Sequence, residues 1–126
     1  MSEVPDGSDP HALANWLFDL ARQGDTARLA AYVDAGAPVD LTDANGNTLL
    51  MLAAYHEHAD TVRALIARGA DVDALNHRGQ SPLSGAVFKQ ADAVLTALLE
   101  AGADPDAGTP SARATARMFG RPDLFD

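Results

Sequence analysis

Apolar residues fall along the chain in short runs with the spacing of amphipathic helices. After Thr48, a residue type suited to cap a helix, the chain is almost continuously apolar for seven residues, which predicts a short and nearly buried helix. Val62, Leu65 and Ile66 then stand at i, i+3 and i+4, the pattern of a second helix that buries one face. Gly69 supplies the left-handed residue that ends this helix.

The polar stretch that follows the two helices, residues 70–79, has too few residues for a third helix. Its last residue, Gly79, permits a positive φ, so the stretch predicts an extended finger with a tight turn. Helices this short are not stable alone in water. The unit must therefore be stabilised by stacking on neighbouring units.

The same unit recurs with a period of 33 residues, which is the strongest signal in the sequence. Glycines, aspartates and apolar residues all keep this spacing: Gly36, Gly69 and Gly102; Asp40, Asp73 and Asp106; Leu17, Leu50 and Leu83. We expect one domain with repeats at about 9–42, 43–75 and 76–108 and a partial repeat at 109–126, preceded by a flexible tail at 1–8. In the first repeat, Asp9-Pro10 predicts a longer helix that runs to about Gln23, and Asp25 predicts a capped second helix.

Two motifs within the period resemble those of ankyrin repeats. The Gly-x-Thr-Pro-Leu-His box of that family appears as GNTLLM at 46–51 and GQSPLS at 79–84, and its Leu-Leu-x-x-Gly-Ala-Asp-Val-Asn close appears at 65–73 and 98–106. The resemblance implies an all-α ankyrin-repeat solenoid of stacked helix-turn-helix units with β-turn fingers. It implies two full repeats between modified N- and C-terminal capping repeats, and a non-catalytic module that binds another protein.

The chain departs from the family pattern at two places. The box histidine is replaced by Met51 and Ser84, so its usual hydrogen bond to the box hydroxyl is expected to be absent. The glycine between the two helices is present as Gly24 but is replaced by Glu57 and Gln90, which leaves open whether the later turns share its geometry.

Stacked identical units place corresponding side chains in rows. The resemblance implies that residues before the inter-helix turns and on the fingers form the concave, partner-binding face. These residues are Arg22, Gln23, Tyr55, His56, Phe88 and Lys89 before the turns, and Asn45, Asn47, His77, Arg78 and Gln80 on the fingers. Tyr55 and Phe88 are the best anchor candidates, because aromatic residues dominate binding hot spots. The alternative is that both rings only cover the stack.

Other polar groups favour structural roles. His56 and His58 are two residues apart, which a helix does not place on one face, so we expect no metal site and a structural role for His58. A further hypothesis is that His56 and His77 approach each other across the groove and make this face weakly pH-sensitive. Aspartates on the fingers (Asp71, Asp73, Asp104 and Asp106) lack the EF-hand spacing, and we expect them to accept backbone N–H groups.

Arg113, Arg117 and Arg121 stand at i, i+4 and i+8 and would form a basic stripe on one helix. Such a stripe could receive an acidic segment of a partner. The interpretation we favour is a solvated helix face that partly neutralises nearby aspartates.

The amino-acid composition excludes several classes of function. Nine Lys and Arg residues against 18 Asp and Glu give a net charge of −9, which argues against nucleic-acid or anionic membrane partners. The chain has no cysteine, so disulfides and thiol chemistry are excluded, and no leader or membrane-spanning run is visible, which favours a cytoplasmic monomer. A bias to Ala and Arg suggests a GC-rich bacterial genome. We expect no cofactor and no enzyme activity.

Two further hypotheses remain. The first is an acidic inhibitor or immunity protein for a basic enzyme such as a nuclease, since the −9 charge would speed encounter with a cationic target. The second, from another class, is a small-molecule or metal-binding enzyme.

Overall fold

The computed structural model describes residues 9–125, and within this range the chain forms seven α-helices, one short 3-10 helix and no extended strand. The helices are α1 (Pro10–Gln23), α2 (Thr26–Asp34), α3 (Leu49–Tyr55), α4 (Ala59–Ala67), α5 (Pro82–Lys89), α6 (Asp92–Glu100) and α7 (Ala112–Met118), followed by the 3-10 helix η1 (Pro122–Leu124). The tail predicted at 1–8 lies outside the described residues, as does Asp126.

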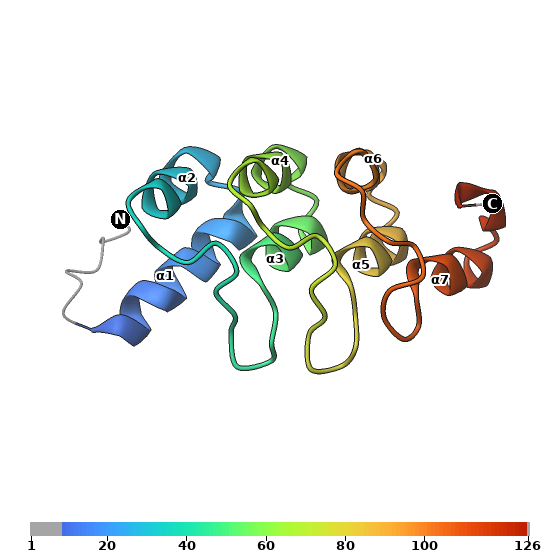
Figure 1. Ribbon diagram of the computed structural model, residues 1–126, viewed down its shortest axis with the longest axis horizontal. Coiled ribbons are helices and arrows are strands. Elements are labelled where there is room, and N and C mark those ends of the chain that lie inside the picture. Colours follow the sequence, from blue (N-terminus) through green and yellow to red (C-terminus); the bar gives the residue numbers. More distant parts are fainter. Residues whose placement is uncertain (1–8, 126) are drawn as a thin grey trace.

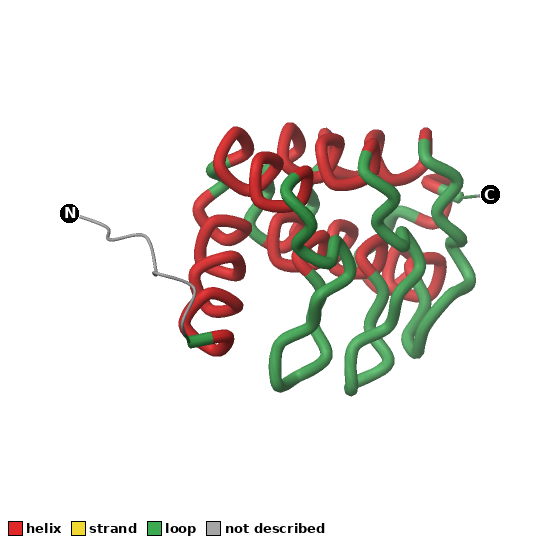
Figure 2. Tube along the Cα trace, turned by 60° about the vertical axis from the view of Figure 1, so that its left-hand side comes forward, coloured by secondary structure: helices red, strands yellow, loops and turns green. Residues whose placement is uncertain are grey.

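The helices form two layers (Figure 1). One layer consists of α1, α3, α5 and α7, each packed against the next, and α2, α4 and α6 form the second layer above it. After each helix pair the chain leaves as a finger, and the three fingers project on the same side of the stack (Figure 2). The all-α solenoid with a 33-residue period is therefore confirmed.

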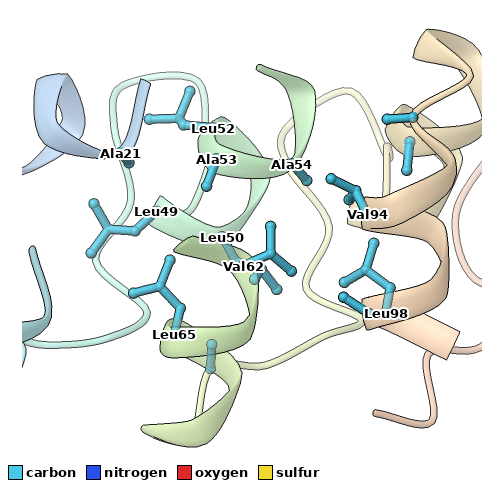
Figure 3. Packing of buried hydrophobic residues seen from close by; sticks show 14 of the residues in the cluster. Ala21, Leu49, Leu50, Leu52, Ala53, Ala54, Val62, Leu65, Val94 and Leu98 are labelled. Atoms are coloured by element: carbon cyan, nitrogen blue, oxygen red, sulfur yellow. The ribbon is translucent and has the colours of Figure 1, made fainter. Parts of the chain in front are cut away.

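The core lies between the two layers and is built from leucine, valine and alanine (Figure 3). Leu50 of α3 and Leu83 of α5 are fully buried, as are Val62 of α4 and Leu98 of α6. Small side chains allow close approach of the helices, for example Ala53, which is also fully buried. Phe18 of α1 also belongs to the core and is only 4% exposed, although the sequence pattern does not indicate it.

Side chains cap most helices of the first layer, as the sequence predicts. Thr48 Oγ1 accepts a hydrogen bond from the Met51 backbone N–H at 3.1 Å. In the next repeat Ser81 and Ser84 form a reciprocal capping box, in which each hydroxyl accepts the other residue's N–H at 3.1 Å. Ser84 therefore supplies a local hydrogen bond at the position where the box histidine is missing.

The inter-helix turns share one geometry despite their different residues. Gly24 has φ +72°, and the residues at its position in the next repeats, Glu57 and Gln90, have φ +67° and +55°. Stacking of the helices thus imposes a left-handed residue at this position whatever its side chain.

Substituting glycine for Glu57 or Gln90 should raise the stability of the domain by up to about 1 kcal/mol each. A side chain costs about 1–2 kcal/mol in the left-handed region, and the extra entropy of glycine in the unfolded chain offsets only part of this gain. Urea denaturation followed by circular dichroism measures the change. A loss of stability in both variants would contradict the left-handed turn.

The last repeat differs from the others. Helix α7 begins after Ser111, only 30 residues after Ser81, so the third finger is shorter than its predecessors. The short helix η1 stands where the earlier repeats have their second helix.

Candidate functional site

A hollow of about 560 Å³ lies between the first-layer helices and the fingers. We define the hollow by its lining residues: Asn47, Met51, Leu52, Tyr55, Asn76, Arg78, Gln80, Ser81, Pro82, Ser84, Gly85, Phe88, Pro110, Thr115, Met118 and Phe119. Its floor comes from α3, α5 and α7, and its wall comes from all three fingers. The lining contains no Asp, Glu, His or Lys.

The structure brings five of the predicted partner-binding residues into the hollow. These are Asn47, Tyr55, Arg78, Gln80 and Phe88. A small neighbouring depression at the finger tips adds Asn45. The remaining predicted residues, Arg22, Gln23, His56, His77 and Lys89, are not part of the lining.

Two of these outlying residues border the hollow through Tyr55. The Lys89 ammonium lies 4.9 Å from the centroid of the Tyr55 ring, a cation–π contact. The His56 ring stands edge-on to the same ring, with 5.6 Å between centroids. Tyr55 therefore connects the lining of the hollow with a border that carries the positive charge of Lys89.

Large apolar side chains in the hollow are exposed to solvent. Tyr55 is 45% and Phe88 56% exposed, so neither ring belongs to the buried core. Met118 and Phe119, at the end of α7, are 72% and 41% exposed, and Phe119 packs edge-to-face against Phe88 at 5.6 Å. Together these four side chains form an apolar row along the stack.

Sequence reasoning missed Met118 and Phe119. At a period of 33 the position after Tyr55 and Phe88 is Arg121, but the shorter third finger moves the register. Aligning the capping serines Ser81 and Ser111 instead gives a step of 30, which places Met118 in the row of Phe88. The spacing of the two capping serines, and not the 33-residue period, therefore indicates the place of Met118 in the row.

Hydrogen bonds within and between the fingers fix the wall of the hollow. The Asn76 side-chain amide donates to Asn47 Oδ1 at 2.9 Å and to Gln80 Oε1 at 2.8 Å. The His77 N–H donates to the carbonyl of Asn45 at 3.0 Å. Asn47 and Gln80 thus hold the fingers in place, in addition to lining the hollow.

His56, His58 and His77 have different neighbours. His58 is structural, as predicted: its Nε2 lies 2.7 Å from the Arg22 carbonyl and joins the first two repeats. The pKa of His56 is lowered by partial burial and by the nearby positive charges of His58, Arg22 and Lys89, which favours neutral imidazole at pH 7. His77 is not one of the charged groups that lower the pKa of His56. Its ring lies against Gly46 instead.

The finger aspartates accept backbone N–H groups, as expected. Within a finger, Asp71 Oδ1 accepts from the Asp73 N–H at 2.9 Å. Between repeats, Asp40 Oδ1 accepts from Asp71 at 2.9 Å and Asp73 Oδ1 from Asp104 at 2.8 Å. Over residues 9–125, no three acidic or histidine side chains are grouped so that they could hold a metal ion.

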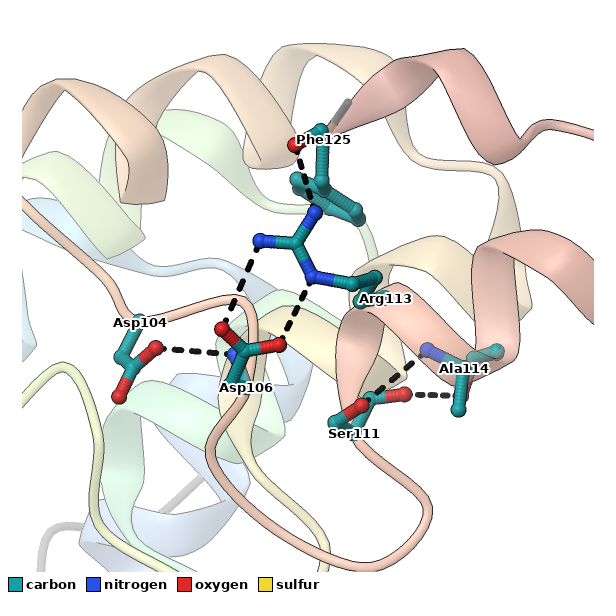
Figure 4. Close-up of polar contacts among 7 residues, drawn as sticks. Asp104, Asp106, Ser111, Arg113, Ala114 and Phe125 are labelled. Atoms are coloured by element: carbon teal, nitrogen blue, oxygen red, sulfur yellow. Dashed lines mark hydrogen bonds and ion pairs between the residues drawn. The ribbon is translucent and has the colours of Figure 1, made fainter.

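The basic stripe expected on one helix is not formed. Helix α7 ends at Met118, so Arg121 lies beyond it and pairs with Asp92 at 3.1 Å. Arg113 donates to Asp106 Oδ1 at 2.8 Å and to the Phe125 carbonyl at 2.7 Å (Figure 4). This pairing lowers the pKa of Asp106. These contacts neutralise nearby aspartates, which agrees with the interpretation favoured from the sequence.

Comparison with known proteins agrees with the fold. The family model for ankyrin repeats in three copies matches residues 17–109. An ankyrin repeat protein of Pseudomonas aeruginosa is 57% identical over 47 residues (37% of this chain and 28% of the relative), and human ankyrin repeat domain-containing protein 29 is 47% identical over 55 residues (43% and 18%). The matched segments thus span less than a third of either curated relative.

A solved structure extends the similarity over most of the chain. The crystal structure of the human ASB11 ankyrin repeat domain superposes with a TM-score of 0.75 at 26% identity, and the match covers 86% of this chain and 51% of that one. In the described part of the chain, no helix has the length and apolar character needed to cross a membrane. The repeat pattern, the two-layer stack and these matches together show that the chain belongs to the ankyrin repeat family.

Proposed function

We propose that this chain binds a protein partner in the hollow and catalyses no reaction. Ankyrin repeats generally serve as protein–protein interaction modules. The observation that carries the proposal is the apolar row of Tyr55, Phe88, Met118 and Phe119, which holds four of the six large apolar side chains exposed in the described part of the chain. Exposed apolar side chains that gather in one concavity are typical of interaction sites.

The hollow is also rigid enough to bind without large ordering costs. Its floor consists of capped helices, and its wall is held by hydrogen bonds from Asn76 to Asn47 and Gln80. A preorganised surface retains more of its contact energy on binding than a mobile one. The row of apolar side chains suits an extended or helical segment of a partner protein.

The lining supports a binding role more than an enzymatic one. It lacks a carboxylate or imidazole that could act as a general base. The two serines in the lining, Ser81 and Ser84, are buried and bonded to each other in the capping box, so neither is an activated nucleophile. An enzyme acting on a small molecule would require catalytic groups that this hollow does not supply.

An inhibitor of a basic enzyme is supported less well. Such a protein would present carboxylates to its target, and the hollow contains none. The finger aspartates Asp71, Asp73 and Asp104 are instead engaged with backbone N–H groups. The excess of 18 acidic residues over nine basic ones still favours a protein partner over nucleic acid.

Replacing Tyr55 and Phe88 by alanine should weaken partner binding at least tenfold, because both rings expose the area that a partner would cover. Immobilised wild-type and Y55A/F88A proteins are compared in extracts of the native host by quantitative mass spectrometry, and the affinity is then measured with the purified partner. The control is Leu99→Ala, which removes an exposed side chain from α6 in the other layer.

Circular dichroism must show that the double variant remains folded, as expected for two half-exposed rings. Equal capture by wild type and double variant would contradict the proposal. Unfolding of the double variant would contradict it too, because the rings would then belong to the core.

A further inference from the structure

The basic residues of this acidic protein are mostly neutralised by ion pairs. Six of the nine lie within 4 Å of a carboxylate: Arg22, Arg28, Arg63, Arg68, Arg113 and Arg121. Within residues 9–125, no ion pair is formed by Arg78, Lys89 or Arg117. Because acidic groups outnumber basic ones two to one, a basic group without a partner requires explanation.

Two of these three basic groups lie at the hollow. Arg78 is part of its lining. Lys89 covers the Tyr55 ring at its border. Arg117 precedes Met118 in α7, but it lies close enough to Asp106 to lower that carboxyl's pKa. Within residues 9–125, Arg78 and Lys89 are therefore the two cations that no carboxylate neutralises.

No acidic residue of the lining offsets these charges. The hollow thus combines an exposed apolar row with two unpaired cations on a protein of net charge −9. A partner with basic residues would meet uncompensated repulsion there, whereas carboxylates would complete two ion pairs beside a desolvated apolar contact.

We propose that the occupant of the hollow is a protein segment that is both acidic and apolar, whose carboxylates pair with Arg78 and Lys89 while its apolar side chains cover Phe88 and Met118. This inference rests on the proposed function and specifies the chemistry of the partner. A second copy of the chain is a poor occupant, because it would bring its whole net charge of −9 against another −9, whereas a partner segment needs only the few carboxylates that pair with the two cations. A nucleic acid carries a charge on every phosphate and meets the net charge of −9 along its whole length, whereas a short protein segment brings only a few carboxylates to the two cations.

Selection from a displayed library of random 12-residue peptides tests this directly. Peptides recovered on the wild-type chain should be enriched in Asp and Glu beside aromatic or aliphatic residues. The R78E/K89E variant should recover peptides enriched in Lys and Arg and should bind the wild-type peptides at least tenfold more weakly. The control variant R28E/R63E carries the same change in net charge at exposed positions on α2 and α4, and it should recover the acidic peptides.

Affinities of the best peptide at low and high salt complete the test, because pairing with exposed cations weakens as salt screens it. Milder substitutions, Arg78→Gln with Lys89→Gln, serve if charge reversal perturbs folding. Selected peptides that require Phe88 but show no acidic excess would overturn this inference and leave the proposed function intact. If recovery is unaffected by Tyr55→Ala with Phe88→Ala, or if no peptide is recovered, the proposed function fails as well. Preferential binding of a single-stranded DNA probe to Arg78 and Lys89 would also overturn the inference.

Discussion

Replacing Leu98 by alanine should lower the free energy of unfolding by about 2–5 kcal/mol. Leu98 lies in α6, is fully buried, and packs in the core between the two helix layers. Alanine would remove three buried carbon atoms and leave a cavity that neighbouring leucines and valines cannot fill without moving whole helices. Because each repeat is stabilised mainly by its neighbours, the loss should lower the stability of the stack as a unit.

The adjacent residue provides a matched control. Leu99 follows in the same helix but is 39% exposed, so Leu99→Ala removes the same atoms with little loss of core packing. It should cost less than about 1 kcal/mol. Urea denaturation of both variants measures the difference. Equal losses would show that α6 does not present Leu98 to the core.

Gly24→Ala should destabilise the domain by about 2–4 kcal/mol, the second largest effect that we expect. Gly24 has φ +72°, a conformation that costs an alanine about 1–2 kcal/mol. A Cβ atom there would also lie 2.5 Å from Nδ1 of the His58 ring. The ring would have to move, and its 2.7 Å hydrogen bond to the Arg22 carbonyl would be lost.

Gly120→Ala separates the two causes. Gly120 has nearly the same backbone conformation, φ +73°, but a Cβ atom there meets nothing within 4 Å. This variant should lose only the conformational part, about 1–2 kcal/mol. Thermal and urea denaturation of both variants give the comparison. If the two substitutions cost the same, His58 does not couple the first two repeats in the way the structure indicates.

Most of the fold could be predicted because the same helix pair and finger recur every 33 residues in the sequence. Glycines after each second helix mark where α2, α4 and α6 end, and hydroxyl or aspartate caps mark where α1, α2, α3, α5 and α7 begin. Helices α1 and α2 lie where their caps predict. Phe18 was missed because a buried residue on a long amphipathic helix can fall beside the main apolar stripe. The turns at Glu57 and Gln90 could not be predicted from residue preference, since packing of the helices overrides it.

The candidate site could be predicted only in part. Tyr55, Phe88 and the finger residues follow from their position in the repeat. The contribution of Met118 and Phe119 depends on the length of the third finger, which breaks the period. The charge pattern depends on ion pairs between residues far apart in the chain, such as Arg68 with Asp34 and Arg63 with Glu100, and no local pattern reveals which cations remain unpaired.

The central claim, that the hollow is the binding surface, is tested most directly by nuclear magnetic resonance. A ¹⁵N-labelled sample of the chain is titrated with its selected peptide or purified partner, and backbone amide shifts are followed. The account predicts that the largest shifts occur at the ends of α3, α5 and α7 and on the second finger, around Tyr55, Arg78, Phe88 and Met118. Shifts concentrated on α2, α4 and α6 would contradict it.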